Sequence, residues 1–569
     1  MAEGNRTGFR TRRAAERLSV GPALGMSLMD SFGITDIIDR TCGYHGESAL
    51  SPGNAVKAIC GTMFTDNKRK ALYNVEGFYS YAPVSRLFGP EVEHSSLNDS
   101  TLGRCLDKVF ESGTTEMFNH ISNHVHTALR LDSRYLHLDA SNITVFKNSG
   151  MEQDECGPKA AFGHAKDGHD ERLQYSFESI VDEHGLQLYM KAHDGNTDDG
   201  RMAMEALRFM ESRLNNQKVC LVADCKVVYA EMVDRLIWNG YPFVSKCPDN
   251  FGENARRRVL DMVRDREFTY IGRIGRRKDS PEFEVCDLDL KANDETLRFI
   301  AYRMVGSSDA HGMEYYRDHC GKKVASALKR LMRQDFACED DARSTTEKVL
   351  EGLLEHPFRI SYNVVEKVFR EKRTSRGRPR KDEPPPKETV RYRIEAAWEF
   401  DEHLARTMAE DHGIRVLVTT LPRAEPEDGD ETRDPKDRDP FEGATMRDVM
   451  RIYLGQWRVE SIFGEYKSNI GADTVFLQTN RRVEVLLFMV AIAAMVRAII
   501  KLLLRENRTR GSPVPNGVTA KRFFFLTSNM FIEVDRSDGM IVLDGSDDDC
   551  IMLEEACAAL DLDPSKLLG

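Results

Sequence analysis

The sequence predicts an α/β protein built around a mixed β-sheet, and the region between residues 135 and 224 carries the evidence. Tyr135 to Phe146 alternates apolar and polar residues and is rich in β-branched side chains, which is typical of a strand. Lys218 to Asp224 is a short continuous apolar run, as expected of a strand buried on both faces. Between them, Leu173 to Asp182 and Leu186 to His193 read as two strands joined by the turn at Glu183-His184-Gly185.

Helices are predicted on either side of the second apolar strand. The run Gly195-Asn196-Thr197-Asp198 supplies a turn and a cap, and it starts a helix over Thr197 to Leu214. After Asp224, a helix is expected over Tyr229 to Asn239 and a strand over Pro242 to Cys247. The order strand, hairpin, helix, strand, helix is the opening of an RNase H-like mixed sheet.

One segment near the C-terminus joins a carboxylate to groups that suit phosphate. Arg451 to Lys467 has the spacing of a helix, and Tyr453, Glu460 and Lys467 recur every seven residues within it. Seven residues are almost two turns at about 3.6 residues per turn, so the three side chains are expected on one helix face. A carboxylate between an aromatic hydroxyl and a lysine suits a metal held beside a phosphate.

Asp139 and Asp224 fall within or at the end of the two predicted sheet strands that flank the hairpin. A buried, ionised and unpaired carboxylate costs several kcal/mol, so such residues usually have a partner or a metal. The alternative is a strand-end carboxylate that caps a turn, and for either aspartate alone the two readings stay open.

With these motifs the chain resembles the DDE transposases of bacterial and archaeal insertion sequences. It is most similar to the branch that has a large insertion before the catalytic glutamate and a Tyr…Arg…Glu…Lys signature around it. Further resemblances occur in the same order as in that branch, at Leu138 to Thr144, Gly163-His164-Ala165-Lys166-Asp167, Gln174, Gly195 to Asp198, Val222-Ala223-Asp224, Leu50 to Ala58 and Leu97 to Asp107. The chain departs from the signature at one position, where Gln456 replaces the arginine and Arg458 follows two residues later. A glutamine cannot act as a cation toward DNA.

The resemblance implies that Asp139, Asp224 and Glu460 are the catalytic residues and metal ligands. Two Mg²⁺ or Mn²⁺ ions about 3.5 to 4 Å apart would activate the nucleophile and stabilise the leaving oxygen of a phosphodiester, and carboxylate oxygens are the ligands these ions require. The expected DNA-binding residues are Tyr453, Gln456, Arg458, Lys467, His164, Lys166, Arg376 and Arg378. The two last belong to an Arg-Gly-Arg-Pro run that can enter a narrow minor groove, although a basic linker without base readout is the simpler reading.

The predicted domain organisation is a helical N-terminal domain, then an RNase H-like catalytic domain interrupted by a β-rich insertion domain. The boundaries are a basic arm (1–23), the helical DNA-binding domain (24–131), the first catalytic part (132–248), the insertion (249–446, with linkers near 374–390 and 424–440), the second catalytic part (447–510) and an acidic C-terminal segment (511–569). Within the insertion, strands are expected at Phe268 to Ile274, Phe283 to Leu288, Thr296 to Met304, Tyr392 to Trp398 and Arg415 to Thr420, and helices at Glu314 to Arg333 and Ser344 to Leu354.

A net charge of −12 at first argues against DNA binding, but the charge is unevenly distributed. Between Asp535 and Gly569, ten acidic and two basic residues account for −8 of it. Basic clusters occur where DNA contacts are expected, at Arg6 to Arg13, Arg256 to Arg258, Arg273 to Lys278 and Lys372 to Lys381. A solvated surface is the alternative reading for any one cluster.

Composition indicates a multi-domain protein with reduced cytosolic thiols, and binding to DNA implies that the protein is cytoplasmic and nucleoid-associated. A chain of 569 residues exceeds the size at which single cores stop growing. The twelve cysteines include no Cys-x-x-Cys pair, and Met1 to Val20 lacks the apolar stretch of a signal peptide. The apolar run Val485 to Val496 is too short to span a membrane and is followed by Arg497 and Lys501, so we expect a core helix and no membrane partner.

The expected function is that of a transposase. It would bind the terminal inverted repeats of its element, cut at the ends and join the 3′ ends to target DNA, acting as a homodimer that bridges both ends in a synaptic complex. Two alternatives remain: a host-adopted nuclease or recombinase of the same fold, and a DNA-binding derivative that has lost catalysis.

Overall fold

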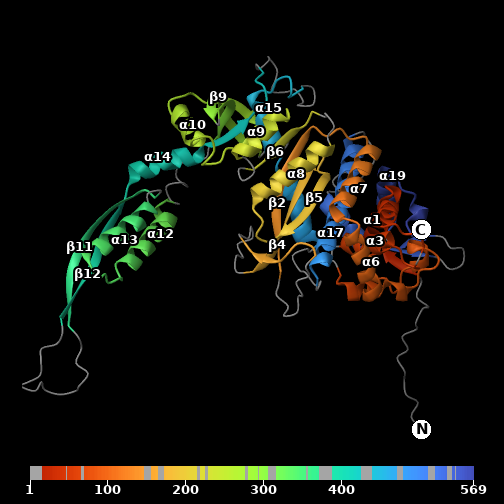
Figure 1. Cartoon of the computed structure of the whole chain (residues 1–569). Helices are drawn as coiled ribbons and strands as arrows, with labels where there is room; N and C mark the ends of the chain where they lie inside the picture. The colour runs from red at the N-terminus through yellow and green to blue at the C-terminus, as the bar shows by residue number, and fades with distance from the viewer. Residues whose placement is uncertain are drawn as a thin grey trace, which may run out of the picture. The chain divides into compact units, whose positions relative to one another are not determined.

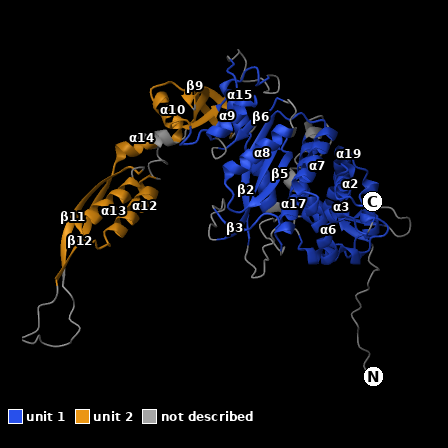
Figure 2. Ribbon diagram, viewed as in Figure 1, with its two compact units in different colours: residues 1–251, 419–426, 434–569 blue, residues 252–418, 427–433 orange. Residues whose placement is uncertain are grey.

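The computed structural model of the chain divides into two compact units (Figure 2). Unit 1 comprises residues 1–251, 419–426 and 434–569, and unit 2 comprises residues 252–418 and 427–433. The structure describes all residues except 1–15, 47, 66–69, 146–155, 164–171, 214–217, 225–228, 276–279, 293, 306–315, 354–355, 371–387, 425–438, 471–478, 510–519, 535–540, 545 and 569.

The centre of unit 1 is an RNase H-like mixed sheet (Figure 1). Five of its strands lie in the order β5-β4-β2-β6-β7, where β2 is Tyr135–Thr144, β4 is Leu173–Asp182, β5 is Gln187–Asp194, β6 is Cys220–Ala223 and β7 is Phe243–Lys246. The short strand β3 (Ala161–Phe162) also pairs with β4. The strand β4 pairs antiparallel with both β2 and β5, and β6 and β7 run parallel to β2. The predicted fold class is confirmed, and each predicted strand of this sheet differs from the observed one by at most two residues at either end.

Both faces of the sheet are covered by helices. On one face α8 (Asp199–Arg213) packs on β5, with the Phe209 ring 4.8 Å from the ring of Tyr189. On the other face lie α16 (Trp457–Gly464) and α17 (Asn480–Thr509), and the Tyr175 hydroxyl of β4 donates a hydrogen bond to Asn480 at 2.8 Å. The helix α9 (Ala230–Trp238) connects β6 to β7, as the sequence predicts.

The N-terminal region is helical and shares one hydrophobic core with the catalytic sheet. Its helices pack against α17. Arg482 of α17 forms an ion pair with Asp107 at 2.7 Å, and the Thr114 hydroxyl donates a hydrogen bond to Glu484 of α17. The N-terminal elements are β1 (Arg17–Ser19), α1 (Val20–Ser31), α2 (Ile34–Thr41), α3 (Pro52–Gly61), α4 (Val75–Phe78), α5 (Val84–Phe88), α6 (Asp99–Glu111) and α7 (Thr114–Ala128).

The helix α17 is long and apolar enough to cross a membrane by composition alone. In this structure, however, 94% of its most apolar window is buried inside the protein. The apolar run therefore forms a core helix, because the N-terminal helices cover one side of it and the sheet covers the other.

The C-terminal segment, predicted only as acidic, is folded against the N-terminal region. Its strand β14 (Phe531–Val534) pairs with both β1 and β15 (Ile541–Asp544), so residues 17–19 form a strand and not part of an arm. The helices α18 (Ala520–Asn529) and α19 (Asp547–Ala559) complete the segment. Met552, Leu553, Ala556 and Cys557 of α19 are buried in the common core, and Asp547, Asp548 and Asp549 form its first turn.

Unit 2 contains the insertion. A three-stranded antiparallel ladder of β8 (Thr269–Arg273), β9 (Glu282–Ala292) and β10 (Glu295–Met304) packs with α10 (Ala255–Val263). Separately, β11 (Phe358–Arg370) and β12 (Glu388–Phe400) form a two-stranded sheet that packs on α12 (Gly321–Leu331) and α13 (Glu339–Glu351). The unit ends with α14 (Glu402–Gly413) and β13 (Arg415–Thr419). The predicted strands of the insertion are confirmed, whereas α10, β11 and α14 were not predicted.

Candidate active site

Asp139 and Asp224 occupy neighbouring positions on two parallel strands. The register of β2 and β6 pairs Leu138 with Ala223. The residue after Leu138 is Asp139, and the residue after Ala223 is Asp224. Adjacent strands are about 4.8 Å apart, so the two aspartate backbones are separated by about that distance. Both side chains are half-buried, and the backbone N–H of Ala140 donates to Oδ1 of Asp139 at 2.8 Å.

The helix that carries Glu460 crosses β2 on the face that bears Asp139. At its start, Nε2 of Gln456 donates to the Leu138 carbonyl at 3.2 Å. Toward its end, the Phe463 ring lies edge-on to Phe177 at 5.4 Å, and Phe177 is the register partner of Ser141. Because alternate residues of a strand share a face, Asp139 lies on the same face as Ser141 and Phe177.

Glu460 lies between these two contacts on α16, so the helix brings it over the part of β2 that bears Asp139. Its side chain is exposed, whereas Val459, Ile462 and Phe463 are buried against the sheet. Among the residues that the structure describes, no three His, Cys, Asp or Glu side chains lie close enough together to hold a metal ion. The backbones of the three predicted ligands thus converge, but their carboxylates are not gathered around one point. The donor set of carboxylate oxygens suits Mg²⁺ or Mn²⁺.

The segment Arg451 to Lys467 is not one regular helix, and this prediction was wrong. The structure has α15 (Met446–Leu454), α16, and then a π-helix, η6 (Glu465–Ile470). At the first junction the Gln456 N–H donates to Tyr453 O at 2.9 Å, which is the spacing of a 3₁₀ turn. Because 3₁₀ and π turns differ from 3.6 residues per turn, the sevenfold spacing does not hold Tyr453, Glu460 and Lys467 on one face.

Gln456 does not fit its predicted contact with DNA. The side chain is 9% exposed, its Nε2 is bound to Leu138, and its Oε1 lies 3.3 Å from Nδ1 of His137. Since an amide oxygen only accepts, the neutral imidazole donates from Nδ1. Where the resembling family has arginine, this chain therefore uses an uncharged residue to fix α16 on β2.

The other predicted DNA-binding residues fall into two groups. Tyr453, Arg458 and Lys467 are half-buried near α16, and the Arg458 guanidinium lies 5.2 Å from the Trp457 ring and donates to Gly455 O at 3.3 Å. His164, Lys166, Arg376 and Arg378 lie outside the described residues. The DNA contacts of both groups remain predictions.

His137 belongs to the site and was missed by the sequence analysis. It is 1% exposed, and burial, followed by the positive charge of Arg458, lowers the pKa of its imidazole to about 4. The alternation of β2 could have revealed it, because His137 is two residues before Asp139 and so shares its face.

The depressed pKa of His137 predicts a specific loss of stability in acid. An unfolded histidine takes up a proton near pH 6.5, whereas folded His137 does so only near pH 4, so the unfolded state binds more protons between these values. Stability from this residue is therefore complete above pH 6.5 and falls by up to about 3 kcal/mol as the pH drops to 4. Urea unfolding of wild type and His137→Gln at pH 7 and pH 4.5 checks this. The wild type should lose more stability between the two values, and equal losses would contradict it.

Gly455 is required by the close approach of α15, α16 and β2. A Cβ at this position would lie 2.5 Å from Nη1 of Arg458, 2.8 Å from Cε1 of His137 and 2.9 Å from the Ile452 carbonyl oxygen. The arginine can move, but the buried imidazole and the backbone cannot do so without shifting α16.

Gly455→Ala should consequently destabilise unit 1 by about 1–3 kcal/mol. Gly464→Ala at the end of α16 is the matched control, because its Cβ would meet no atom within 4 Å and alanine favours a helix over glycine by about 1 kcal/mol. Thermal melting of both variants measures the difference. The steric argument fails if the two glycines respond alike.

Three of the motifs shared with the family meet at one end of the sheet. Asn142 donates to Oε1 of Gln174 at 2.9 Å, and Nε2 of Gln174 donates to Gly195 O at 2.8 Å. A Cβ on Gly195 would lie 1.9 Å from the Gln174 carbonyl oxygen, so only glycine fits there. These contacts join β2, β4 and the start of the α8 region just beyond Asp139.

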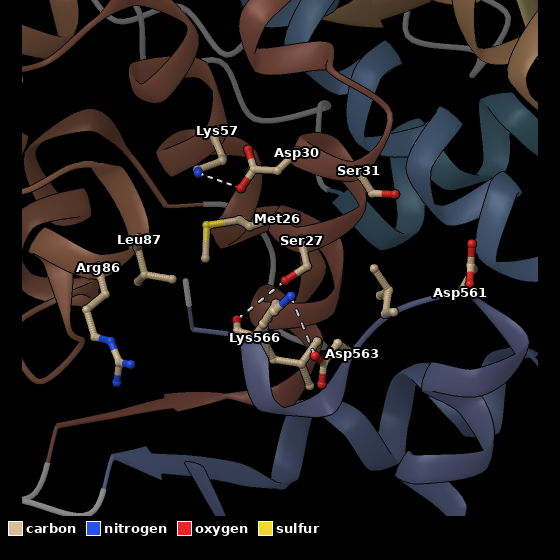
Figure 3. A pocket seen from close by; sticks show the side chains of 12 residues that line it. Met26, Ser27, Asp30, Ser31, Lys57, Arg86, Leu87, Asp561, Asp563 and Lys566 are labelled. Carbon is tan, nitrogen blue, oxygen red and sulfur yellow. Dashed lines mark hydrogen bonds and ion pairs between the residues drawn. The ribbon is translucent and has the colours of Figure 1, made fainter. Parts of the chain in front are cut away.

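A cavity of about 350 Å³ lies elsewhere in unit 1, between the N-terminal helices and the C-terminal segment (Figure 3). Lys57 points to Asp30 there and forms an ion pair at 2.8 Å, and Ser27 donates to Leu567 O. Lys566 pairs with Asp563 at 3.8 Å within one turn of the C-terminal segment. Arg86 and Asp561 also line this cavity, and none of the predicted site residues lines it.

Comparisons with known proteins support the transposase interpretation. Residues 385–496 match the family model described as "Transposase DDE domain", and residues 23–123 match a domain of unknown function (DUF4277). The first match includes Glu460 but neither aspartate. No curated protein matches the chain.

The chain is similar to one solved structure described as "Cryo-EM structure of piggyBac transposase synaptic complex with hairpin DNA (SNHP)". It is 9% identical to this chain, the similarity covers 90% of this chain and 79% of that chain, and the TM-score is 0.38. The family match agrees with the RNase H-like sheet of this chain. Two aspartates lie side by side on that sheet, and the helix that carries Glu460 packs over the sheet. Residues 385–496 of this chain are thus similar to the DDE domain of transposases.

Proposed function

We propose that this chain is a transposase that binds the terminal inverted repeats of its element, cuts at both ends and joins the exposed 3′ ends to target DNA. The observation that carries the proposal is the register of β2 and β6, which makes Asp139 and Asp224 neighbours beneath the helix of Glu460. Carboxylates at these three positions are the donors that a metal-dependent phosphoryl transfer requires.

Asp139, Asp224 and Glu460 would hold the divalent metal. When bound, Mg²⁺ or Mn²⁺ would supply activation of the attacking oxygen and charge stabilisation at the phosphate. The protein's own contribution is position: the rigid strands β2 and β6 fix the two aspartates, and the bonds from Gln456 to Leu138 and His137 fix the start of α16. Glu460 follows Gln456 by one helical turn, so this anchor sets its distance from Asp139.

The DNA would be contacted around this centre. Lys467 would bind a phosphate as a point charge and Tyr453 through its hydroxyl, while Arg458 offers a guanidinium at the start of α16. Two ends must be cut in one complex, so the working form is proposed to be a homodimer that bridges both ends, acting on DNA in the cytoplasm.

The decisive experiment is an end-cleavage assay on the DNA that flanks the coding region, with products resolved on a denaturing gel. Mg²⁺-dependent nicks at the borders of terminal inverted repeats, followed by strand transfer, are the expected result. Binding without cleavage at any metal concentration would favour the inactive DNA-binding derivative. Cleavage at sites unrelated to inverted repeats would favour a host-adopted nuclease.

A further inference from the structure

The cavity of Figure 3 lies where the N-terminal helices meet the C-terminal segment, and it has the size of a small-molecule site. Its volume of about 350 Å³ is within the range of about 300–1,000 Å³ that is usual for ligand pockets. Residues of α1, α3 and α5 form one side, and residues between 561 and 567 form the other. The apolar part of the lining consists of Met26, Leu87, Leu562 and Leu567, so the cavity can surround a ligand with an apolar body.

The ionisable side chains that line the cavity are three cations and three carboxylates, so their charges cancel. Four of them form two ion pairs, Lys57 with Asp30 at 2.8 Å and Lys566 with Asp563 at 3.8 Å. An anionic or cationic ligand would leave the filled cavity with a net charge. A ligand that carries one charge of each sign would keep it neutral.

The two remaining side chains, Arg86 and Asp561, are the groups that such a ligand would bind. Within the part of the chain that the structure describes, neither side chain forms a hydrogen bond or an ion pair. Figure 3 shows them on opposite sides of the cavity, with Met26 and Ser27 between them. The unpaired positive and negative groups are thus set apart, as the two ends of an elongated zwitterion are.

Lys57 offers further donors on the Arg86 side of the cavity (Figure 3). Its side chain is only 6% exposed, and an ammonium group has three N–H donors. Among the described residues it donates a hydrogen bond to Asp30 alone, and the Phe88 ring centre lies 5.5 Å from the nitrogen. Because a buried donor without an acceptor costs free energy, a carboxylate that enters the cavity would be bound by Lys57 as well as by Arg86.

We propose that this cavity binds a short apolar peptide with free ends, whose C-terminal carboxylate lies at Arg86 and Lys57 and whose N-terminal ammonium lies at Asp561. A dipeptide or tripeptide carries its opposite charges at its two ends with an apolar body between them. A free amino acid carries both charges on one carbon and would engage one end only. The bound peptide would contact both walls and so hold the C-terminal segment on the N-terminal helices. This inference goes beyond the proposed function and does not depend on it.

The test measures binding of leucyl-leucine and trileucine to the full-length protein by isothermal titration calorimetry and thermal melting. At least one of the two peptides should bind at one site per chain and raise Tm by about 2 °C or more at a hundredfold excess over its Kd. The N-acetylated peptide lacks the ammonium and the C-terminal amide lacks the carboxylate. Each should bind at least about tenfold more weakly, as should free leucine.

Two variants assign each end of the peptide to its residue. Both side chains are exposed, so Arg86→Gln and Asp561→Asn should fold, and asparagine tolerates the positive φ of 54° at residue 561. Arg86→Gln should bind the free peptide at least about tenfold more weakly and should no longer distinguish it from its amide. Asp561→Asn should lose affinity to a similar degree and should no longer distinguish the free peptide from its acetylated form.

Arg104→Gln and Glu554→Gln are the matched controls, because each neutralises an exposed side chain of unit 1 that does not line the cavity. The inference is overturned if neither peptide binds, if the blocked peptides bind as well as the free ones, or if the control variants lose as much affinity. No arm of the test involves DNA, so each of these outcomes would leave the proposed function intact.

Discussion

Asp224→Asn should abolish Mg²⁺-dependent cleavage of element ends while leaving end binding intact. The substitution keeps the size of the side chain and removes the charge that a hard cation requires. Loss of metal-supported charge stabilisation costs several kcal/mol in the transition state, and 1.36 kcal/mol is a factor of ten, so a rate loss of about 10³-fold or more is expected. Asp139→Asn should behave in the same way, because its backbone lies one strand spacing from that of Asp224.

Two comparisons make the result specific to metal binding. Asp234→Asn on α9 removes an exposed carboxylate from the same unit and should cleave at the wild-type rate. Asp224→Cys should be inactive with Mg²⁺ and partly active with Mn²⁺, because the softer ion accepts a thiolate more readily. Undiminished cleavage by Asp224→Asn would remove Asp224 from the catalytic set, and an equal loss in Asp234→Asn would indicate a general effect on folding.

The sheet was predictable from sequence because its signals are local. The apolar run before Asp224 and the alternation around Asp139 each specify a strand without reference to the rest of the chain. Their pairing follows from a known strand order, so the convergence of the two aspartates could also be expected. What sequence could not supply was the register, which decides that Asp139 and Asp224, and not residues one position away, are adjacent.

The errors arose where long-range contacts override local pattern. The helix from Arg451 to Lys467 was predicted as regular because its apolar spacing is helical, but Gly455 and the bonds of Gln456 to β2 tighten one turn. The C-terminal segment was predicted from its charge alone. The buried residues of α19 pack in a core that includes residues more than 500 positions earlier in the sequence. The strand β14 pairs with β1 near the N-terminus. No local signal specifies either contact.

Arg497 and Lys501 have a role that the sequence could not reveal. They were read only as charges that interrupt an apolar run. In the structure, Nε of Arg497 donates to Glu465 at 2.9 Å, and Lys501 also binds this carboxylate. Glu465 begins the π-helix directly after α16 and is 6% exposed. The two cations on α17 therefore hold the end of the helix that carries Glu460, as Gln456 holds its start.

Glu465→Ala should destabilise unit 1 by about 3–5 kcal/mol, because it leaves the buried Arg497 without its counter-charge. The double variant Glu465→Leu/Arg497→Met should recover most of this loss, since apolar residues of similar volume can replace a buried ion pair. The introduced methionine side chain could still pack on Phe524, whose ring centre lies 3.9 Å from the Arg497 guanidinium in the wild type. Urea unfolding measures both effects. If the carboxylate also positions α16, the double variant should be stable yet cleave element ends more slowly than wild type. Full activity in that variant would mean that Gln456 and the packing of Phe463 suffice to place Glu460.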